Sequence, residues 1–261
     1  MAERPLGKSV PIPTAYAPEV LVALSRDEAR ARIGLTATDL EGCAGVDRWE
    51  ADELSWLDER GKPCVARAEF HFPATSPELV ESKSLKLYLH SLNQERFGAS
   101  ARVGDRIRRD LSHAVGTDVE VRLTRITDPP SLDRRSLAGR CIDEDEVDIT
   151  TYALAPELLA DACGADEPAD ETLVTHLFRS LCPVTAQPDW ASVSVSYRGM
   201  SIDSRALLRY LVSFRETQAF HEACVERILA DVREHCRPQA LTVEARFAFR
   251  GGLAIHPLRY I

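Results

Sequence analysis

The order strand, helix, helix, strand occurs twice along this chain of 261 residues, at an offset of roughly 120 positions. In the first copy, alternating apolar residues predict a strand at 64–72, and apolar residues at helical spacing predict a helix within 79–97. A second helix near 103–111 and a strand at 119–124 complete the copy. An offset this long indicates two large similar modules rather than an array of short repeats.

The second copy follows the same order. Alternation predicts strands at 193–197 and 241–249, and Asp203 or Ser204 can cap the helix that follows the first of them. A further amphipathic helix is predicted near 225–232. Strands that alternate with paired helices indicate an α+β fold, with antiparallel sheets and helices on one face. Such sheets have edges that can pair between the modules or between subunits.

The modules suggest four parts, with a proline-containing irregular stretch over residues 1–30 at the start and an acidic run over 141–148 between the modules. We interpret the acidic run as a solvated connector. A metal site built from it is the alternative, although no histidine accompanies it in the sequence. The expected parts are an N-terminal arm (1–40), a first module (41–130), a connector (131–170) and a second module (171–261).

Composition restricts the class of partner and the compartment. The net charge of −9 argues against direct binding of nucleic acid, which usually requires a basic face. No apolar run is long enough to span a membrane and the first residues lack a secretory apolar segment, so we expect a cytoplasmic protein. The seven cysteines form no C-x-x-C pair, and most are expected to be buried free thiols rather than disulfides.

One of these cysteines lies in an unusual segment. Cys182 is followed by Pro183 and Pro188, so the segment is expected to be a shaped loop that leads into a strand. Asp189 follows seven positions after the cysteine. A thiol with a nearby carboxylic acid can serve as a nucleophile with a proton donor. From spacing alone, a structural cysteine and a turn aspartate remain the alternative.

Three further segments combine polar residues with glycine or helix starts. Glu81-Ser-Lys-Ser-Leu-Lys-Leu-Tyr88 gathers polar residues and two lysines at a predicted helix N-terminus, where free N–H groups favour anions. His221-Glu222 opens a later helix with the histidine on its inward stripe, and Arg250-Gly-Gly252 ends the last predicted strand. A solvated helix face, a core histidine and a simple turn are the alternative readings of these segments.

Taken together, these segments resemble a family. Glu81 to Tyr88 is similar to the signature of the NADPH-dependent 7-cyano-7-deazaguanine reductases of queuosine biosynthesis, and Cys182 to Trp190 resembles their nucleophile segment. Phe220-His-Glu222 and Arg250-Gly-Gly-Leu253 resemble two further family segments. The order fits the long, two-module form and covers nearly the whole chain. His90-Ser-Leu92 departs from the Asn-Ser-Phe of the family, on the far side of the helix from Glu81.

The resemblance implies a fold and an assembly. Each module is expected to be a tunnelling-fold unit (β-β-α-α-β-β), which requires additional strands before Phe72, within 47–58. The two-module form implies a homodimer, with a pocket that joins Glu81, Cys182 and Glu222.

The resemblance also implies a reaction. NADPH would reduce the nitrile of 7-cyano-7-deazaguanine to an aminomethyl group through a covalent thioimide, with no metal. The expected catalytic residues are Cys182 as nucleophile, Asp189 as proton donor and His221. The expected substrate-binding residues are Val80, Glu81, Ser82, His221 and Glu222, and the expected NADPH-binding residues are Ser82, Lys83, Arg250 and Gly251. The absence of a G-x-G-x-x-G sequence is consistent with cofactor binding outside a Rossmann domain.

Three other classes of function remain open from the residues. A nitrile or amide hydrolase would start from the same thioimide but would not consume NADPH. A zinc-dependent pterin-type hydrolase would require metal-ligand partners for Cys182. A non-catalytic purine-binding module would tolerate the loss of Cys182.

Overall fold

The computed structural model describes residues 10–128, 136–160, 162–163 and 167–261. Contacts divide these residues into two compact units, each assembled from several stretches of the chain. The first unit comprises the described residues of 1–28, 46–131 and 249–255, and the second those of 29–45, 132–248 and 256–261.

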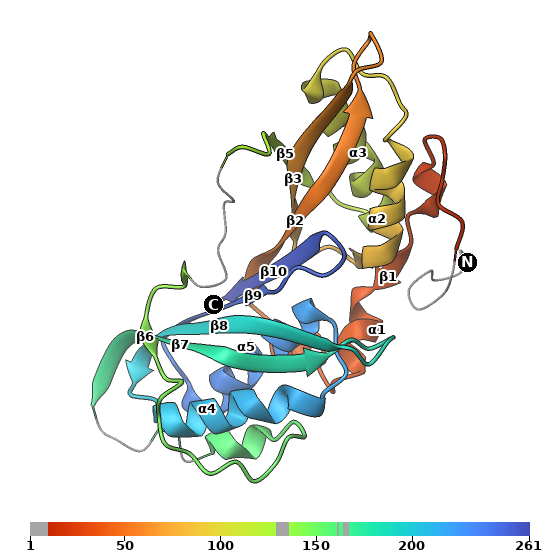
Figure 1. Cartoon of the computed structure of the whole chain (residues 1–261). Coiled ribbons are helices and arrows are strands. Elements are labelled where there is room, and N and C mark those ends of the chain that lie inside the picture. Colours follow the sequence, from red (N-terminus) through yellow and green to blue (C-terminus); the bar gives the residue numbers. More distant parts are fainter. Residues whose placement is uncertain (1–9, 129–135, 161, 164–166) are drawn as a thin grey trace. The chain divides into compact units, whose positions relative to one another are not determined.

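The first unit is a small antiparallel sheet with two helices on one face (Figure 1). Strand β2 (Ala44–Leu57) pairs with β3 (Pro63–Pro73), and β3 pairs on its other edge with β5 (Glu120–Thr124). The helices are α2 (Ser82–Ser91) and α3 (Ser100–Val115). The predicted strand at 64–72 and the predicted helices are therefore confirmed, and β2 covers the additional strand expected within 47–58.

The amphipathic pattern of α3 explains its position. Its fully buried side chains are Val103, Ile107, Leu111 and Val115, which recur every fourth residue and form one stripe toward the sheet. The helix stops at Gly116, which has φ of 70°. A left-handed residue at this position is a common helix terminator and is most easily adopted by glycine.

The first stretch of the chain is more ordered than its prolines predict. Strand β1 (Ala23–Ser25) pairs antiparallel with β4 (Glu78–Val80), and β1 is followed by α1 (Arg26–Ala31). The expectation of an irregular arm over residues 1–30 is therefore wrong for this part. A three-residue strand is too short to give a periodic signal, and it depends on a partner far away in the sequence. A short 3₁₀ helix, η1 (Pro18–Val20), also lies in this stretch, and a second one, η2 (Thr38–Leu40), follows α1.

The second unit is built on a long hairpin of β7 (Pro168–Leu181) and β8 (Pro188–Met200). Strand β9 (Ala240–Phe247) pairs with β8, and the last residues of β10 (Leu253–Tyr260) pair with β9. At the other edge, β6 (Arg140–Cys141) pairs with β7 in parallel, so the expectation of purely antiparallel sheets needs this correction. The helices of this unit are α4 (Ser204–Val212), α5 (His221–Cys236), η4 (Pro156–Leu159) and η5 (Ser213–Glu216).

The helices of the second unit share one apolar core with its strands. Asp203 caps α4, because its side chain accepts a hydrogen bond from the backbone N–H of Arg205. The acidic run is less solvated than expected. Asp143 accepts hydrogen bonds from the Thr175 hydroxyl and the His176 backbone N–H, and Asp145 accepts one from the Ser204 hydroxyl.

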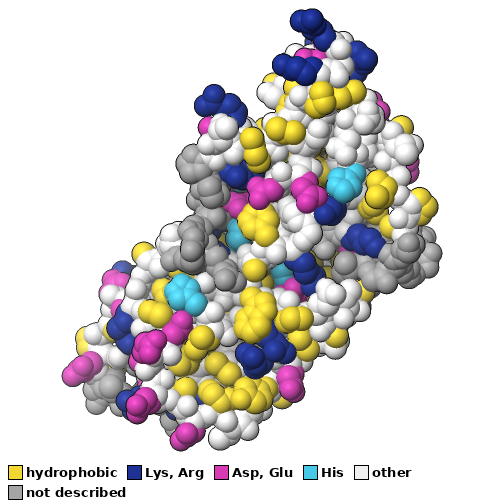
Figure 2. Space-filling view, in the orientation of Figure 1, with side chains coloured by type: hydrophobic (Ala, Val, Ile, Leu, Met, Phe, Trp, Pro, Cys, Tyr) yellow, Lys and Arg dark blue, Asp and Glu magenta, His cyan; other side chains and the backbone are white. Residues whose placement is uncertain are grey.

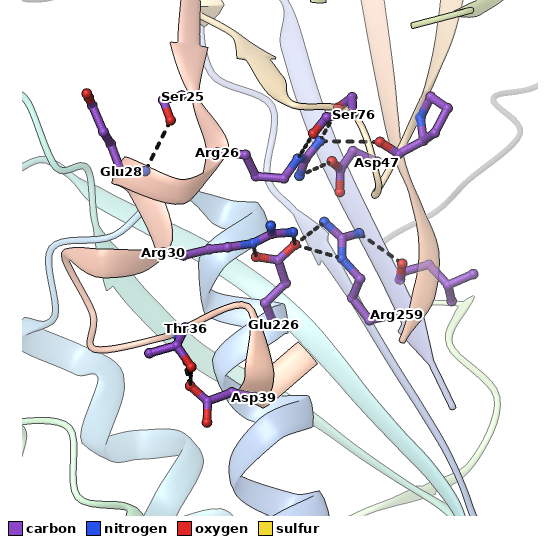
Figure 3. A network of polar contacts seen from close by, with 12 residues as sticks. Ser25, Arg26, Glu28, Arg30, Thr36, Asp39, Asp47, Ser76, Glu226 and Arg259 are labelled. Atoms are coloured by element: carbon purple, nitrogen blue, oxygen red, sulfur yellow. Dashed lines mark hydrogen bonds and ion pairs between the residues drawn. The ribbon is translucent and has the colours of Figure 1, made fainter. Parts of the chain in front are cut away.

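Each unit contains a buried ion pair (Figure 3). In the first unit, Nη1 of Arg26 lies 3.0 Å from Oδ2 of Asp47. In the second unit, Glu226 of α5 lies between two guanidinium groups, with Nε of Arg30 at 2.9 Å and Nη2 of Arg259 at 3.0 Å. Removing one partner of such a pair leaves a buried charge and typically costs about 3–5 kcal/mol. Glu226 therefore ties α5 to two other segments of the second unit.

The surface carries both signs of charge. On the face drawn in Figure 2, acidic and basic side chains are interspersed. Among the described residues, no helix combines the length and the apolar character needed to cross a membrane.

Candidate active site

Cys182 lies at the end of the hairpin of β7 and β8 in the second unit. Its backbone N–H donates to the carbonyl of Gln187 at 2.8 Å, and the N–H of Ala186 donates to the carbonyl of Cys182 at 3.0 Å. Ala186 adopts φ of 55°, a conformation that side chains rarely take. These bonds close the loop and fix the cysteine, whose side chain is buried. The predicted shaped loop is confirmed.

Asp189 lies on β8 directly after this loop. It is the cross-strand partner of Ser180 on β7, and it is 6% exposed. Oδ2 of Asp189 lies 3.2 Å from Nε2 of His221, the first residue of α5. The strand end and the helix start therefore hold a carboxylate and an imidazole in contact, which sequence spacing alone did not show.

The ring of His221 is held by an aromatic neighbour. It stacks on Phe247 of β9 with a centroid distance of 3.8 Å and an interplanar angle of 6°. Nδ1 of His221 is buried and has no hydrogen-bond partner in the described part of the chain. One nitrogen of the ring thus contacts Asp189, and the other is a buried polar atom without a partner in the described residues.

The cysteine and the histidine are brought to the same end of the unit by a short strand-like contact. The N–H of Leu181 donates to the carbonyl of Thr217 at 2.9 Å, and the N–H of Ala219 donates to the carbonyl of Leu181 at 3.1 Å. Residues 217–219 therefore run beside the residue that precedes Cys182, immediately before α5 begins. Glu222, which follows His221, is buried.

A second buried thiol lies near these groups, which sequence reasoning did not identify as part of the site. Burial raises the pKa of Cys224 to about 12, the neighbouring Ser180 hydroxyl acts in the opposite direction, and the charges of Asp189 and Glu222 raise it further. Cys224 is therefore a thiol at neutral pH and a poor nucleophile. Its place three residues after His221, one helical turn along α5, was the signal available in the sequence.

The cysteines are less uniformly buried than predicted. All seven are free, as expected, but only Cys182, Cys224 and Cys236 are fully buried. Three others are partly exposed and Cys141 is exposed.

In the first unit, Glu81 caps α2. Its carboxylate accepts hydrogen bonds from the backbone N–H groups of Lys83 at 3.0 Å and Ser84 at 2.7 Å. Burial raises the pKa of Glu81, whereas these bonds lower it. The prediction of an anion site made from free N–H groups at this helix start therefore needs correction, because Glu81 already occupies two of them. A carboxylate has about four lone-pair positions, so Glu81 retains the capacity to accept bonds from a ligand.

The other predicted residues of the first unit lie around this helix start and a tight turn. Val80 is buried at the end of β4, and Ser82 and Lys83 are partly exposed in the first turn of α2. Arg250 is exposed and begins a turn in which its N–H donates to the carbonyl of Leu253 at 2.8 Å.

Gly251 links this turn to α2. Nζ of Lys86 donates to the carbonyl of Gly251 at 2.6 Å, so the structure joins the two predicted cofactor-binding segments. Gly251 has φ of 63°, which favours glycine, and a side chain there would extend toward Nζ of Lys86. An exposed cationic turn with no side chain at its tip is suited to the phosphates of a dinucleotide.

The acidic run contributes to a different cluster. Ligand atoms of Cys141, Asp143 and His176 lie within 4.8 Å of one another in the second unit. The structure thus supplies the histidine that the sequence did not place beside the run. In the part of the chain that the structure describes, this is the group with metal-ligand spacing, and it does not include Cys182.

Comparisons with known proteins agree with the resemblance drawn from the motifs. A family profile described as "Nitrile reductase, 7-cyano-7-deazaguanine-reductase N-term" matches residues 12–123, and one described as "QueF-like protein" matches residues 188–260. Among solved structures, the crystal structure of an archaeosine synthase QueF-Like in the apo form aligns with 37% of this chain and 94% of its own, at 17% identity and a TM-score of 0.32.

Curated relatives match over nearly the full length. The relative from Bordetella parapertussis is 48% identical over 99% of this chain and 93% of its own length. Those from Desulfotalea psychrophila and Azoarcus sp. are 49% and 50% identical over 98% of this chain, and over 91% and 89% of their own lengths. All three are named NADPH-dependent 7-cyano-7-deazaguanine reductase, and the chain belongs to this family.

Proposed function

We propose that the protein reduces the nitrile of 7-cyano-7-deazaguanine to the aminomethyl group of 7-aminomethyl-7-deazaguanine through a covalent thioimide on Cys182, in queuosine biosynthesis. Membership of the family makes the chain an NADPH-dependent oxidoreductase. One observation supports the covalent route. Cys182 is buried in the loop between β7 and β8, and β8 carries Asp189 in contact with His221.

The first step is addition of the thiolate to the nitrile. Thiolate is the strongest nucleophile among ordinary side chains near neutral pH, and a nitrile carbon is electrophilic. A bond forms between Sγ of Cys182 and this carbon, and one C–N bond opens toward nitrogen. Asp189 donates a proton to that nitrogen, and His221 can replace the proton through its 3.2 Å contact with the carboxyl group.

Two reductions follow. Bound NADPH supplies one hydride to the carbon at each of two stages. After the first, Cys182 holds the carbon as a hemithioaminal and leaves with the C–S electron pair as thiolate, which gives an imine. The second reduction and a further proton give the aminomethyl group, so the two hydrides supply the four electrons and the two protons complete the four added hydrogen atoms.

Carboxylates recognise the base in this proposal. The pyrimidine edge of a guanine-like base presents N–H donors, which suit the buried carboxylates of Glu81 and Glu222. Val80, Ser82 and His221 would line the same pocket, with Nδ1 of His221 free of other described partners. NADPH would be held by Ser82, Lys83, Arg250 and Gly251, which fit it because Lys86 joins their two segments.

The proposal includes the assembly. Each of the predicted modules, 41–130 and 171–261, would be a tunnelling-fold unit, and the active form would be a cytoplasmic homodimer that does not bind nucleic acid directly. Apart from the short strand β4 in the first and the short helix η5 in the second, β2 to β5 and β7 to β9 both follow the order strand-strand-helix-helix-strand, which supports the tandem arrangement.

Intact-protein mass spectrometry tests the covalent step directly. The full chain mixed with 7-cyano-7-deazaguanine in the absence of NADPH should gain the mass of the nitrile, and peptide mapping should place it on Cys182. Addition of NADPH should discharge the adduct, with two NADPH oxidised for each nitrile reduced. Turnover without an adduct on Cys182 would contradict the thioimide, and nitrile consumption without NADPH would indicate a hydrolase.

A further inference from the structure

Trp190 is an exposed tryptophan flanked by two arginines. Its side chain is 42% exposed, whereas Trp49 and Trp56 are buried. The guanidinium carbon of Arg179 lies 5.7 Å from the centroid of the Trp190 ring, and that of Arg215 lies 5.5 Å from it. The three side chains come from β7, β8 and η5 of the second unit.

The pairing of β7 with β8 explains why Arg179 lies next to Trp190. Arg179 is the cross-strand partner of Trp190, so the two side chains share a face of the hairpin. Successive residues of a strand point to opposite faces, so Trp190 lies on the face opposite the buried side chain of Asp189. The cluster is therefore adjacent to the reacting residues in sequence but separate from the position of the Asp189 carboxyl group.

The two positive charges have no counter-charge within the described part of the chain. No ion pair to Arg179 or Arg215 is present among the described residues, in a chain with a net charge of −9. Nε of Arg179 is buried and has no hydrogen-bond partner in the described part of the chain. Two like charges over one ring repel each other unless an anion joins them. A planar ring with two such guanidinium groups is suited to an aromatic ligand that carries phosphate.

We infer that Trp190, Arg179 and Arg215 bind the phosphorylated adenosine end of NADPH, with the adenine against the Trp190 ring and the 2′-phosphate between the guanidinium groups. This inference relies on the proposed use of NADPH in the reduction, and it adds a second contact region to the turn at Arg250. It explains how the enzyme distinguishes NADPH from NADH, since a 2′-phosphate is the chemical difference between them.

Adenosine 2′,5′-bisphosphate is the probe, titrated into the full chain by calorimetry, with adenosine 5′-monophosphate as the comparison. Arg179→Gln and Arg215→Gln should each weaken bisphosphate binding by about tenfold or more, because each removes a charge-assisted hydrogen bond to phosphate. Binding of the monophosphate should change much less. Arg198→Gln, on the same strand as Trp190 and roughly 25 Å further along it, is the matched charge control and should bind normally.

A fluorescence measurement gives a second readout. Since Trp190 is the exposed tryptophan, acrylamide should quench its emission in the free protein, and the bisphosphate should protect it. Unchanged bisphosphate affinity in both arginine variants, or an equal loss in Arg198→Gln, would overturn the inference. Formation of the nitrile adduct needs no NADPH and should persist in both arginine variants, so failure of this binding region is distinguishable from failure of the thioimide chemistry.

Discussion

Nε2 of His221 lies 3.2 Å from Oδ2 of Asp189, and both side chains are largely buried. At this distance the imidazole and the carboxyl group are close enough to exchange a proton directly. The stacked Phe247 ring fixes the plane of the imidazole, so the contact does not depend on a mobile side chain. In the proposed reaction, Asp189 on the strand and His221 on the helix would therefore act together as one proton-transfer unit.

Asp189→Asn should lower turnover by about 10² to 10⁴ and change substrate affinity little, because a general acid acts on the nitrogen only as charge develops there. His221→Gln should lower turnover less, since Asp189 remains. The fold-loss of turnover in the double variant should be smaller than the product of the two single fold-losses, because the effects of residues in contact are not independent. Steady-state kcat and KM for all three variants check this. A change confined to KM would identify Asp189 as a binding residue.

Cys182→Ala should abolish both the nitrile adduct and turnover while leaving the fold intact. Cys64→Ala is the matched control, because Cys64 is a partly exposed free thiol of the first unit, and it should retain both. Intact mass after incubation with the nitrile, together with circular dichroism, checks the pair of variants. Reductase activity in Cys182→Ala would remove the basis of the proposed mechanism.

Glu81 has two roles that substitution can separate. Glu81→Ala should lower the free energy of unfolding by about 1 kcal/mol, because α2 loses its cap, and should also weaken substrate binding. Glu81→Asn keeps a capping side chain but not the carboxylate, so it should be nearer the wild type in stability and still bind substrate about tenfold or more weakly. Urea denaturation and calorimetry measure the two effects. Normal substrate binding by Glu81→Asn would show that Glu81 is a cap alone.

The sequence predicted the elements whose stabilising contacts are local or strongly periodic. The stripe of Val103, Ile107 and Leu111 is sufficient to predict α3, because the pattern itself buries one face. For β2, only an approximate range of residues could be predicted, since a register shift between Ala51 and Leu54 interrupts the alternation of buried and exposed side chains along the strand. Strands β1 and β6 are two or three residues long and are defined by partners more than 30 residues away, as the pairing of β6 with Leu173 shows.

The features of the candidate site also differ in whether the sequence could predict them. Cys182 and Asp189 are visible in the sequence because prolines mark their loop, and both are where the pattern placed them. The contact of Asp189 with His221 and the proximity of Cys224 depend on how α5 packs against the hairpin, which no local pattern specifies. The capping role of Glu81 was also hidden, because glutamate is not a typical capping residue.

Stability should fall in alkaline solution. Burial raises the pKa of Cys224 to about 12 and that of Tyr197 to about 12, with the Glu171 carboxylate adding to the effect on Tyr197. Both groups hold their protons more tightly in the folded protein than in the unfolded chain. Their contribution to the free energy of unfolding is therefore complete below about pH 9 and is lost as the pH rises toward 12. Each pKa unit corresponds to about 1.4 kcal/mol, so a loss of a few kcal/mol is expected.

Urea denaturation at a series of pH values measures this loss. Tyr197→Phe removes the hydroxyl that donates to Glu171 and accepts from the Ile202 N–H, so this variant should start less stable at pH 8 and lose less between pH 9 and 12. Equal slopes for the variant and the wild type would show that Tyr197 does not titrate in this range.

The final prediction concerns whether the proposed pocket is assembled from one chain or two. Glu81 belongs to the first unit and Cys182 to the second, and the proposed reaction needs both at one base. A closed twofold dimer is the simplest assembly of a two-module chain with sheet edges. Light scattering of active enzyme at low concentration should therefore give twice the chain mass, and a fully active monomer would refute the dimer. Glu81→Ala and Cys182→Ala proteins should then be mixed at a substrate concentration too low for Glu81→Ala to turn over, with exchange verified by mass-tagged chains. Recovered activity would show that the two residues of one pocket come from different chains, because only a mixed dimer contains one intact pocket. If mixed dimers form and stay inactive, the arrangement of one pocket from two chains is wrong.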